Sequence, residues 1–312
     1  MRLKIFHKLN YNANIIVDIH HESTEYMTMA KNDPNADINL VKDFWEKNPL
    51  WTGESRFKEG TKEFFEEHRN IYLDDCFAGI FDQRFIPKSS VISDGYKILD
   101  LGCGAGFWLV EFNARGFKNL YGVDLTSAAI ELSKKRAELY GFDVQLSMQN
   151  AEELTFPDSS FDHVNCQGVI HHTPNTDKAV AEISRILKAG GSASISVYYQ
   201  NIFLRNWPKI GRIGRLLYNL GAGMKGRGRE NIFLETDPDE IVKLYDGRDN
   251  PIGKAYSKDG FIELLHPHFF IEETYLHFFP ARALPFKIPN FLHRFLDKAF
   301  GFMIFASVTK RN

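Results

Sequence analysis

Residues 98–107 spell ILDLGCGAGF, an apolar run that closes in a turn with three glycines, Gly102, Gly104 and Gly106. The run predicts a short buried strand, and the residues after it predict a helix. Glycine lets a ligand come close to the backbone, and a helix N-terminus after a strand points N–H groups at one spot. We therefore expect a ligand at this turn. A tight turn that packs only on itself is the alternative.

Strands and helices alternate beyond the turn. Apolar runs predict strands at 96–101, 119–124, 143–148, 161–169, 192–199, 269–278 and 302–310. Helices are predicted from the glycine turn to about 115, and at 126–141, 177–191 and 257–265, the third of these four ending at its glycine pair. Such alternation predicts an α/β fold with a parallel sheet and right-handed crossovers.

Composition limits the class of protein. The chain has 312 residues, is 44% apolar and 25% charged, and carries a formal net charge of −2, which indicates no nucleic-acid or membrane role for the whole chain. Three scattered cysteines argue against a disulfide framework or a zinc site, so we expect no metal. No leader peptide or stretch of roughly 20 apolar residues is evident, and we predict a cytoplasmic protein.

Four parts are predicted along the chain. Residues 1–40 are weakly patterned and predict a loosely ordered arm. Aromatic residues at helical spacing predict a helical cap over 41–90. Residues 91–312 form the ligand-binding α/β domain, whose alternation is interrupted by an insertion at 201–256 that we interpret as a lid.

The glycine turn lacks one feature of a dinucleotide site. The spacing is G-x-G-x-G, and Phe107 stands where the third fingerprint glycine is expected. Asp124 ends the next strand, 22 positions after Gly102, where an acidic residue can accept both ribose hydroxyls. This combination indicates a nucleoside ligand without a pyrophosphate. A helix N-cap is the alternative role for Asp124.

At this point the chain resembles a known family. Five segments, at 98–106, 122–126, 149–156, 161–175 and 186–191, resemble in order the motifs of class I S-adenosylmethionine-dependent methyltransferases, in the quinone-methyltransferase-like branch. The similarity is strong over 97–199. Flanks at 44–49, 60–65 and 250–257 resemble uncharacterised bacterial members. The resemblance implies a Rossmann-like, seven-stranded, mostly parallel doubly wound sheet with an N-terminal helical cap and a lid insertion.

The resemblance also implies S-adenosylmethionine as the cofactor. The glycine turn would pass beneath its methionine part, Asp100 would hold its ammonium group, and Asp124 would bind its ribose. Asn150 stands where Asp is commoner, and its amide oxygen can still accept an adenine N–H. The full set implied is Asp100, Gly102, Cys103, Gly104, Gly106, Asp124, Leu125, Asn150, Ala151, Gln167 and Gly168.

Methyl transfer to a hydroxyl or an acidic carbon benefits from a base. His171 and His172, in HHTP after the fourth strand, are adjacent histidines at the edge where ligands bind in open α/β sheets. We predict that one of them acts as a base or orients the substrate, with His171 favoured because it is nearer the strand. A structural histidine beside a solvated one is the alternative.

The acceptor is predicted to be a small organic or lipid-like molecule methylated on O, N or C. Trp51, Phe64 and Tyr72 are the expected pocket residues, with core packing as the alternative. Residues 201–229 hold seven basic and no acidic side chains, with apolar residues at helical spacing. This pattern is typical of a lid, of a helix at a membrane surface, or of a solvated face. Nucleic acid is disfavoured.

Two rival functions remain open from the sequence. The same fold supports aminopropyl transfer from a decarboxylated donor, which the carboxylate-binding turn disfavours. A regulator that binds S-adenosylmethionine without catalysis is the other rival.

Overall fold

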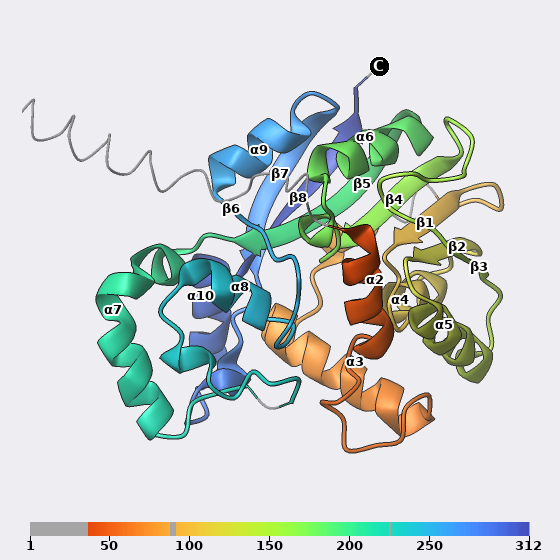
Figure 1. Ribbon diagram of the computed structural model, residues 1–312. Coiled ribbons are helices and arrows are strands. Elements are labelled where there is room, and N and C mark those ends of the chain that lie inside the picture. The colour runs from red at the N-terminus through yellow and green to blue at the C-terminus, as the bar shows by residue number, and fades with distance from the viewer. Residues whose placement is uncertain (1–36, 88–91, 225, 312) are drawn as a thin grey trace, which may run out of the picture.

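The computed structural model describes residues 37–87, 92–224 and 226–311, which form an α/β fold around one sheet (Figure 1). Seven strands follow the order β3-β2-β1-β4-β5-β8-β7, and a short strand, β6, pairs with β5 outside this path. The strands are β1 (Lys97–Leu101), β2 (Asn119–Asp124), β3 (Gln145–Met148), β4 (Phe161–Gln167), β5 (Leu187–Tyr199), β6 (Ala255–Tyr256), β7 (Phe269–His277) and β8 (Met303–Lys310). The pairs β5–β8 and β7–β8 are antiparallel, and the other strand pairs are parallel. The predicted mostly parallel, doubly wound sheet is confirmed.

The order of the strands reverses at β1, which lies between β2 and β4. Because these three strands are parallel, their carboxyl ends meet at one edge. A reversal of this kind leaves a crevice at that edge, where ligands bind in open α/β sheets.

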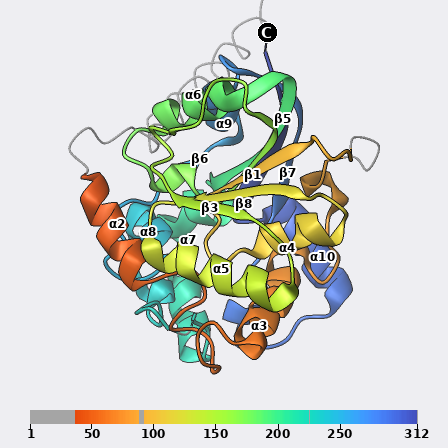
Figure 2. The same cartoon turned by 90° about the vertical axis from the view of Figure 1, so that its right-hand side faces the viewer.

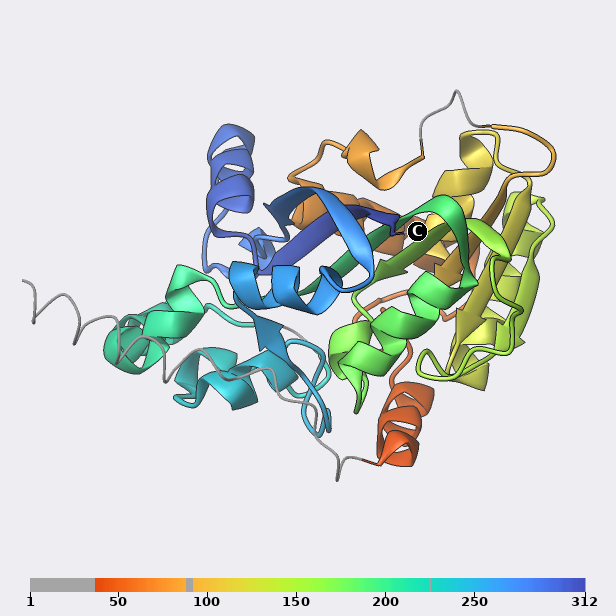
Figure 3. The same ribbon diagram turned by 90° about the horizontal axis from the view of Figure 1, so that it is seen from above.

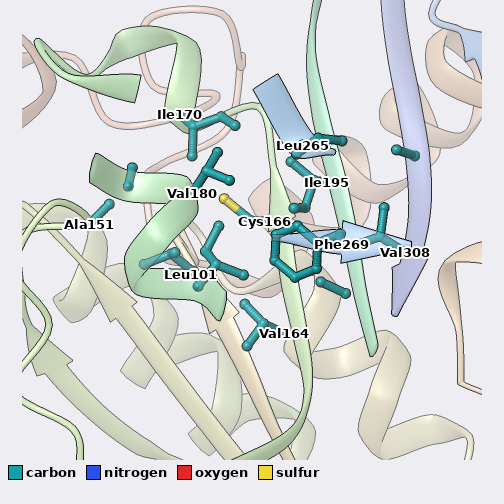
Figure 4. Close-up of a cluster of buried hydrophobic side chains, with 14 of the residues drawn as sticks. Leu101, Ala151, Val164, Cys166, Ile170, Val180, Ile195, Leu265, Phe269 and Val308 are labelled. Atoms are coloured by element: carbon teal, nitrogen blue, oxygen red, sulfur yellow. The ribbon is translucent and has the colours of Figure 1, made fainter. Parts of the chain in front are cut away.

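Helices cover both faces of the sheet (Figure 2). One face carries α4 (Phe107–Ala114) and α5 (Ser127–Tyr140), and the other carries α6 (Thr176–Ile186) and α9 (Lys258–Leu265). Figure 4 shows the core beneath α6 and α9, where Val180, Leu265 and Phe269 pack around Cys166. Cys166 is fully buried, in keeping with a small apolar core residue.

One predicted boundary is wrong. The helix expected to stop at the glycine pair 190–191 ends at Ile186, and Leu187 already belongs to β5. Leu187 pairs with Phe161, and the register then shifts, so the glycines lie in an irregular stretch of strand. Gly190 has a φ of 70°, which glycine adopts without strain.

Two helices precede the sheet, α2 (Ile38–Lys47) and α3 (Lys62–Phe77). Residues 1–36 of the predicted arm lie outside the described residues, and Ile38 already begins α2. The buried guanidinium of Arg136, on the helix at 127–140, connects α3 to the glycine turn. It donates to the carbonyls of Ala105 at 3.1 Å and Phe65 at 3.4 Å, and it contacts His68 Nδ1 at 3.3 Å.

The insertion after β5 contains α7 (Ile202–Asn219), a short turn of helix η4 (Ile232–Leu234), α8 (Pro238–Leu244) and β6. The chain then returns through α9 and β7 to α10 (Asn290–Phe300) and β8. Figure 3 shows α7, α8 and α10 gathered at one end of the molecule. None of the helices in the described ranges is long and apolar enough to cross a bilayer.

Candidate functional site

The glycine turn is held against the end of β2 by the backbone. The N–H groups of Gly102 and Cys103 both donate to the carbonyl of Val123, at 2.7 and 2.9 Å. Gly102 has a φ of 73°, and a Cβ atom there would lie 2.2 Å from Cγ2 of Val169. Only glycine therefore fits this position, which leaves the main chain bare toward the crevice.

Asp124 is fixed at the carboxyl end of β2. One carboxylate oxygen accepts from the Thr126 N–H at 3.0 Å and from its hydroxyl at 2.9 Å, and the other accepts from the Gly104 N–H at 3.1 Å. Thr126, not Asp124, caps α5 through its hydroxyl. The carboxylate thus links the second strand to the glycine turn and has lone pairs left for a ligand.

A cavity of about 330 Å³ opens at this edge. The sheet contributes Gly102, Gly104, Asp124, Leu125, Asn150, Ala151, Gln167 and Gly168 to its lining. The N-terminal helices and the loop between them contribute Trp45, Trp51, His68 and Tyr72, and the insertion contributes Trp207, Arg227, Arg229, Tyr245 and Asp246. One hollow therefore joins the glycine turn to a chamber between the helical cap and the insertion.

Three residues of the expected cofactor set lie behind the cavity wall. The side chain of Cys103 is buried beside Ser133, and Gly106 begins α4. Asp100 is buried and accepts from Asn165 at 2.7 Å, while Asn165 accepts from Gln167 at 3.2 Å. Burial raises the pKa of Asp100 to about 7, although the bond from Asn165 lowers it. Asp100 therefore connects to the cavity through Asn165 and Gln167, and its role toward an ammonium group stays a prediction.

The Asn150 side chain forms a hydrogen bond within its own turn. Its Oδ1 accepts from the Glu152 N–H at 3.0 Å, which fixes the turn after β3. An amide oxygen has two lone pairs, so one remains for an adenine N–H. Gln167 is more open to a ligand, because its Oε1 is buried without a hydrogen-bond partner in the described part of the chain.

The structure separates the two adjacent histidines. His172 lines the cavity, and its Nδ1 lies 2.6 Å from the carbonyl of Ile252, so Nδ1 carries a proton. Its Nε2 lies 3.3 Å from Oδ2 of Asp246. Oδ2 also accepts from the Tyr198 hydroxyl at 2.6 Å. His172, Asp246 and Tyr198 thus form one polar network in the wall of an otherwise largely apolar chamber.

His171, the favoured histidine, faces away from the chamber. Its ring is fully buried, with centroids 4.1 Å from His172 and 4.2 Å from Tyr198. Burial drives the pKa of His171 well below its usual value. His172 therefore lines the cavity and His171 does not, because the turn η3 (Ile170–His172) points consecutive side chains in different directions, and a role of either histidine as a base stays a prediction.

Two of the three expected pocket residues line the cavity, Trp51 and Tyr72. Phe64 does not, since it is fully buried and packs in one cluster with Trp51, Phe65 and Leu132. Phe64 lies two turns before Tyr72, near the start of α3, where its side chain packs in the same cluster as Leu132 of α5.

A carboxylate in the loop before α3 meets three arginines. Glu54 lies 2.7 Å from Arg229, 3.3 Å from Arg282 and 3.9 Å from Arg227. Arg282 also lies 2.5 Å from Asp75. The side chains of Glu54, Arg227 and Arg229 are nearly inaccessible to solvent, so these ions are held in a dry part of the chamber wall.

Several residues of the cavity wall are not predicted from the sequence. Asp246 and Tyr198 sit in no motif, and only folding brings them to His172. Trp45 lies in the flank 44–49 and contacts the His172 ring at 5.2 Å between centroids. Glu46 beside it accepts from the N–H groups of Ser127 and Ala128 at the start of α5. The resemblance of 44–49 to bacterial relatives was the sequence feature that pointed to this side of the cavity.

Comparisons with known proteins match the region around this crevice. Residues 99–195 match the methyltransferase domain family. This region is a class I methyltransferase domain. The chain is 31% identical over 137 residues to the uncharacterised methyltransferase YcgJ of Bacillus subtilis, covering 43% of this chain and 54% of YcgJ. It is 28% identical to the ubiquinone biosynthesis O-methyltransferase of Hahella chejuensis, covering 54% and 64%.

The methyltransferase fold also has a structural counterpart. A Haloferax volcanii protein, solved in complex with the Trm112 methyltransferase activator, aligns with a TM-score of 0.50 at 15% identity. The alignment covers 80% of this chain and 96% of that one. At this identity the likeness concerns the fold. The matches to the curated relatives leave a third or more of their length uncovered.

S-adenosylmethionine is the cofactor of this domain, and the residues at the turn fit it. Gly102 leaves the main chain bare because no side chain fits there. Asp124 offers a fixed carboxylate, and Gln167 a buried oxygen that lacks a partner among the described residues. These groups match a ligand with hydroxyl and ammonium donors.

Proposed function

We propose that this protein transfers the methyl group of S-adenosylmethionine to an O, N or C atom of a small organic or lipid-like acceptor. The supporting observation is the cavity that joins the glycine turn and Asp124 to an aromatic chamber between cap and insertion. A cofactor at the turn and an acceptor in the chamber would meet at Gln167, Gly168 and His172, which line the same hollow.

The cofactor half uses the sheet edge. Asp124 accepts the ribose hydroxyls, Leu125 packs on the adenine, and Asn150 with Ala151 contacts the adenine amino edge. Gln167 and Gly168 lie beside the methionine part. The bound cofactor supplies an electrophilic methyl group on a sulfonium, so the chain mainly has to position two molecules, an effect worth roughly 7–11 kcal/mol.

The acceptor half uses the chamber. Trp45, Trp51, Tyr72 and Trp207 give it apolar walls that suit an aromatic or lipid-like molecule and exclude water from the reacting atoms. A soluble, highly charged acceptor is disfavoured there, because the arginines in the wall are already paired with Glu54 and Asp75.

The proton released by an acceptor hydroxyl would go to the His172–Asp246 pair. Nδ1 of His172 already donates to Ile252, so Nε2 is the ring atom that would take up the proton. A proton taken up there lies between Nε2 and the Asp246 carboxylate and gains a second partner. Tyr198 holds Asp246 in place from the other side.

Calorimetric binding of S-adenosylmethionine and S-adenosylhomocysteine, with NAD as the comparison ligand, tests the cofactor half. Asp124→Ala should weaken binding roughly ten- to a hundredfold, because charge-assisted hydrogen bonds to a ribose are worth about 1.5–3 kcal/mol. Asp143→Ala, at an exposed position before β3, is the matched control and should bind normally. Equal binding by wild type and Asp124→Ala would contradict the site.

An acceptor screen with labelled S-adenosylmethionine follows. Methylated product from an apolar acceptor supports the chamber assignment, and product only from strongly charged acceptors contradicts it. A cytoplasmic location and a peripheral membrane contact through 205–229 belong to the same proposal.

A further inference from the structure

Helix α7 has two apolar sides, one that lines the cavity and one that is exposed to solvent. Phe203, Leu204 and Trp207 line the cavity. On another side, Ile202, Ile213, Leu216 and Leu220 are between 49% and 61% exposed. Their spacing of eleven, three and four residues puts them in one stripe along the helix. Asn206 and Lys209 lie on the same side between Ile202 and Ile213, so the continuous apolar surface covers about the last two turns of the helix, from Ile213 to Leu220.

Helix α10 repeats this arrangement. Phe291 is 75% exposed and Phe295 is 61% exposed, one turn apart on the same side. Phe286, just before the helix, is 58% exposed. Exposed phenylalanines of this size are unusual on a protein surface unless they contact something.

The charges beside these stripes all have one sign. Seven exposed basic residues accompany them: Arg205, Lys209, Arg212, Arg215, Lys287, Arg294 and Lys298. None of the seven forms an ion pair with a carboxylate of the described residues. Helix α7 has no acidic residue, and the one in α10, Asp297, is buried against His277.

The two helices lie at the same end of the molecule, opposite β3, in both Figure 1 and Figure 3. Aromatic contacts connect them. Phe295 lies 6.3 Å from Phe300 between ring centroids, and Phe300 lies 5.4 Å from Phe203 at the start of α7. These contacts join α10 to the first turn of α7 on its cavity side, and the exposed stripe of α7 lies on the other side of that helix.

We propose that α7, α10 and Phe286 form a docking face for an anionic lipid bilayer. Exposed aliphatic and aromatic side chains flanked by Lys and Arg are the composition of helices that lie in a membrane interface. Clusters of basic residues are attracted to anionic lipid headgroups. A protein partner fits less well, because seven basic side chains without carboxylate partners among the described residues would need an equally acidic protein surface, whereas anionic headgroups supply that charge over a whole bilayer.

Docking by this face also has a consequence for the acceptor. Helix α7 separates the docking face from the apolar chamber, so a lipophilic acceptor would have a short route from the bilayer past α7. This consequence rests on the proposed methyl transfer. The docking extends the membrane contact proposed for 205–229 to α10 and Phe286, and it does not depend on methyl transfer.

Sedimentation of the full chain with vesicles tests the proposal. The vesicles are phosphatidylcholine alone and phosphatidylcholine with phosphatidylglycerol, each at low and high salt. Binding should require phosphatidylglycerol and weaken with salt. Leu216→Gln/Leu220→Gln and Phe291→Gln/Phe295→Gln should each reduce binding at least about tenfold. Arg212→Gln/Arg215→Gln should remove part of the salt dependence.

Leu139→Gln is the matched control, since Leu139 is half-exposed on α5, away from both helices. It should bind vesicles as the wild type does. Calorimetry with S-adenosylmethionine checks that every variant is folded and keeps failure of docking distinct from failure of the cofactor site. Equal binding to both vesicle types would overturn the proposal. So would a concentration-dependent dimer, lost in Leu216→Gln/Leu220→Gln, with no vesicle binding.

Discussion

His171 and His172 are neighbours in the chain but occupy different environments. His172 reaches the cavity and Asp246, whereas His171 is enclosed between His172 and Tyr198. One residue of separation in a tight turn is enough to reverse the direction of a side chain. Residue type and spacing alone therefore favour neither histidine.

Replacing each histidine separates a catalytic role from a structural one. His172→Gln should lower turnover by about 10²–10⁴-fold, the usual contribution of a general base, and leave S-adenosylmethionine affinity nearly unchanged. His171→Gln should lower the unfolding midpoint more than turnover. Full turnover by His172→Gln would contradict the role given to the His172–Asp246 pair.

The cost of a side chain at Gly102 can be compared with the cost at Gly141, a glycine with a similar positive φ but no atoms near the place of a Cβ. Gly141 ends α5 at a φ of 69°, and a Cβ atom added there would meet nothing within 4 Å. Gly141→Ala therefore isolates the backbone cost of about 1–2 kcal/mol. Gly102→Ala adds a clash with Val169, a further cost of about 1–3 kcal/mol, and should abolish cofactor binding. Urea denaturation and calorimetry measure the two effects. Equal losses in both variants would show that Val169 moves aside.

At the scale of elements, His277 at the end of β7 connects that strand to α10 and to the turn after α3. Its Nδ1 lies 2.5 Å from Asp297 of α10, and its Nε2 lies 2.9 Å from Asp82, which caps the turn η1 (Gln83–Phe85). Burial alone would lower the pKa of His277, but the hydrogen bonds to Asp297 and Asp82 raise it above its usual value. Burial alone would raise the pKa of Asp82, but hydrogen bonds from His277 and Arg84 outweigh burial and lower it.

This ion cluster predicts a pH-dependent stability. The contribution of His277 is complete below its unfolded pKa of about 6.5 and is lost as pH rises through the raised folded pKa. That of Asp82 is present above its unfolded pKa of about 3.9 and is lost only as pH falls through the lowered folded pKa. The free-energy difference between wild type and His277→Gln should therefore be larger at mildly acidic pH than in alkali.

Chemical denaturation across that pH range measures the difference. His266→Gln serves as the control because His266 is exposed, and its effect should be small at every pH. A His277→Gln deficit that grows as pH rises would mean that His277 is neutral in the folded protein.

At the scale of the whole molecule, Glu54 connects the N-terminal segment to the insertion and to the stretch before α10. Its partners Arg227, Arg229 and Arg282 are more than 170 positions away in the sequence. Because Glu54, Arg227 and Arg229 are buried, removing the charge of Glu54 leaves two buried arginines without that compensation. The closure of the chamber thus depends on a carboxylate that belongs to no motif.

Glu54→Gln should destabilise the protein by about 3–5 kcal/mol, the usual cost of breaking a buried ion pair. Glu59→Gln, an exposed neighbour in the same loop, should cost almost nothing. Urea denaturation measures both. A neutral Glu54→Gln would show that the arginines find other partners and that the chamber closes without this contact.

Much of the fold was predictable from local pattern. The alternation of apolar strands with capped helices indicated the sheet, and the glycine turn with Asp124 indicated the ligand edge. The end of α6 was not predictable, because the pairing of Leu187 with Phe161 overrides the glycine signal. Phe64 and His171 were misplaced for a related reason, since their direction depends on the packing around them.

The sequence by itself determined the parts of the site that one short segment can build: the bare glycine turn, the acid at the end of β2 and the amide at the end of β4. Their chemistry follows from backbone geometry and residue type over a few positions. Only the tertiary structure decided the acceptor side. His172, Tyr198, Asp246 and Glu54 come from four separate segments, and long-range packing brings them together. The same packing covers one side of α7 with the chamber and leaves its other apolar side exposed.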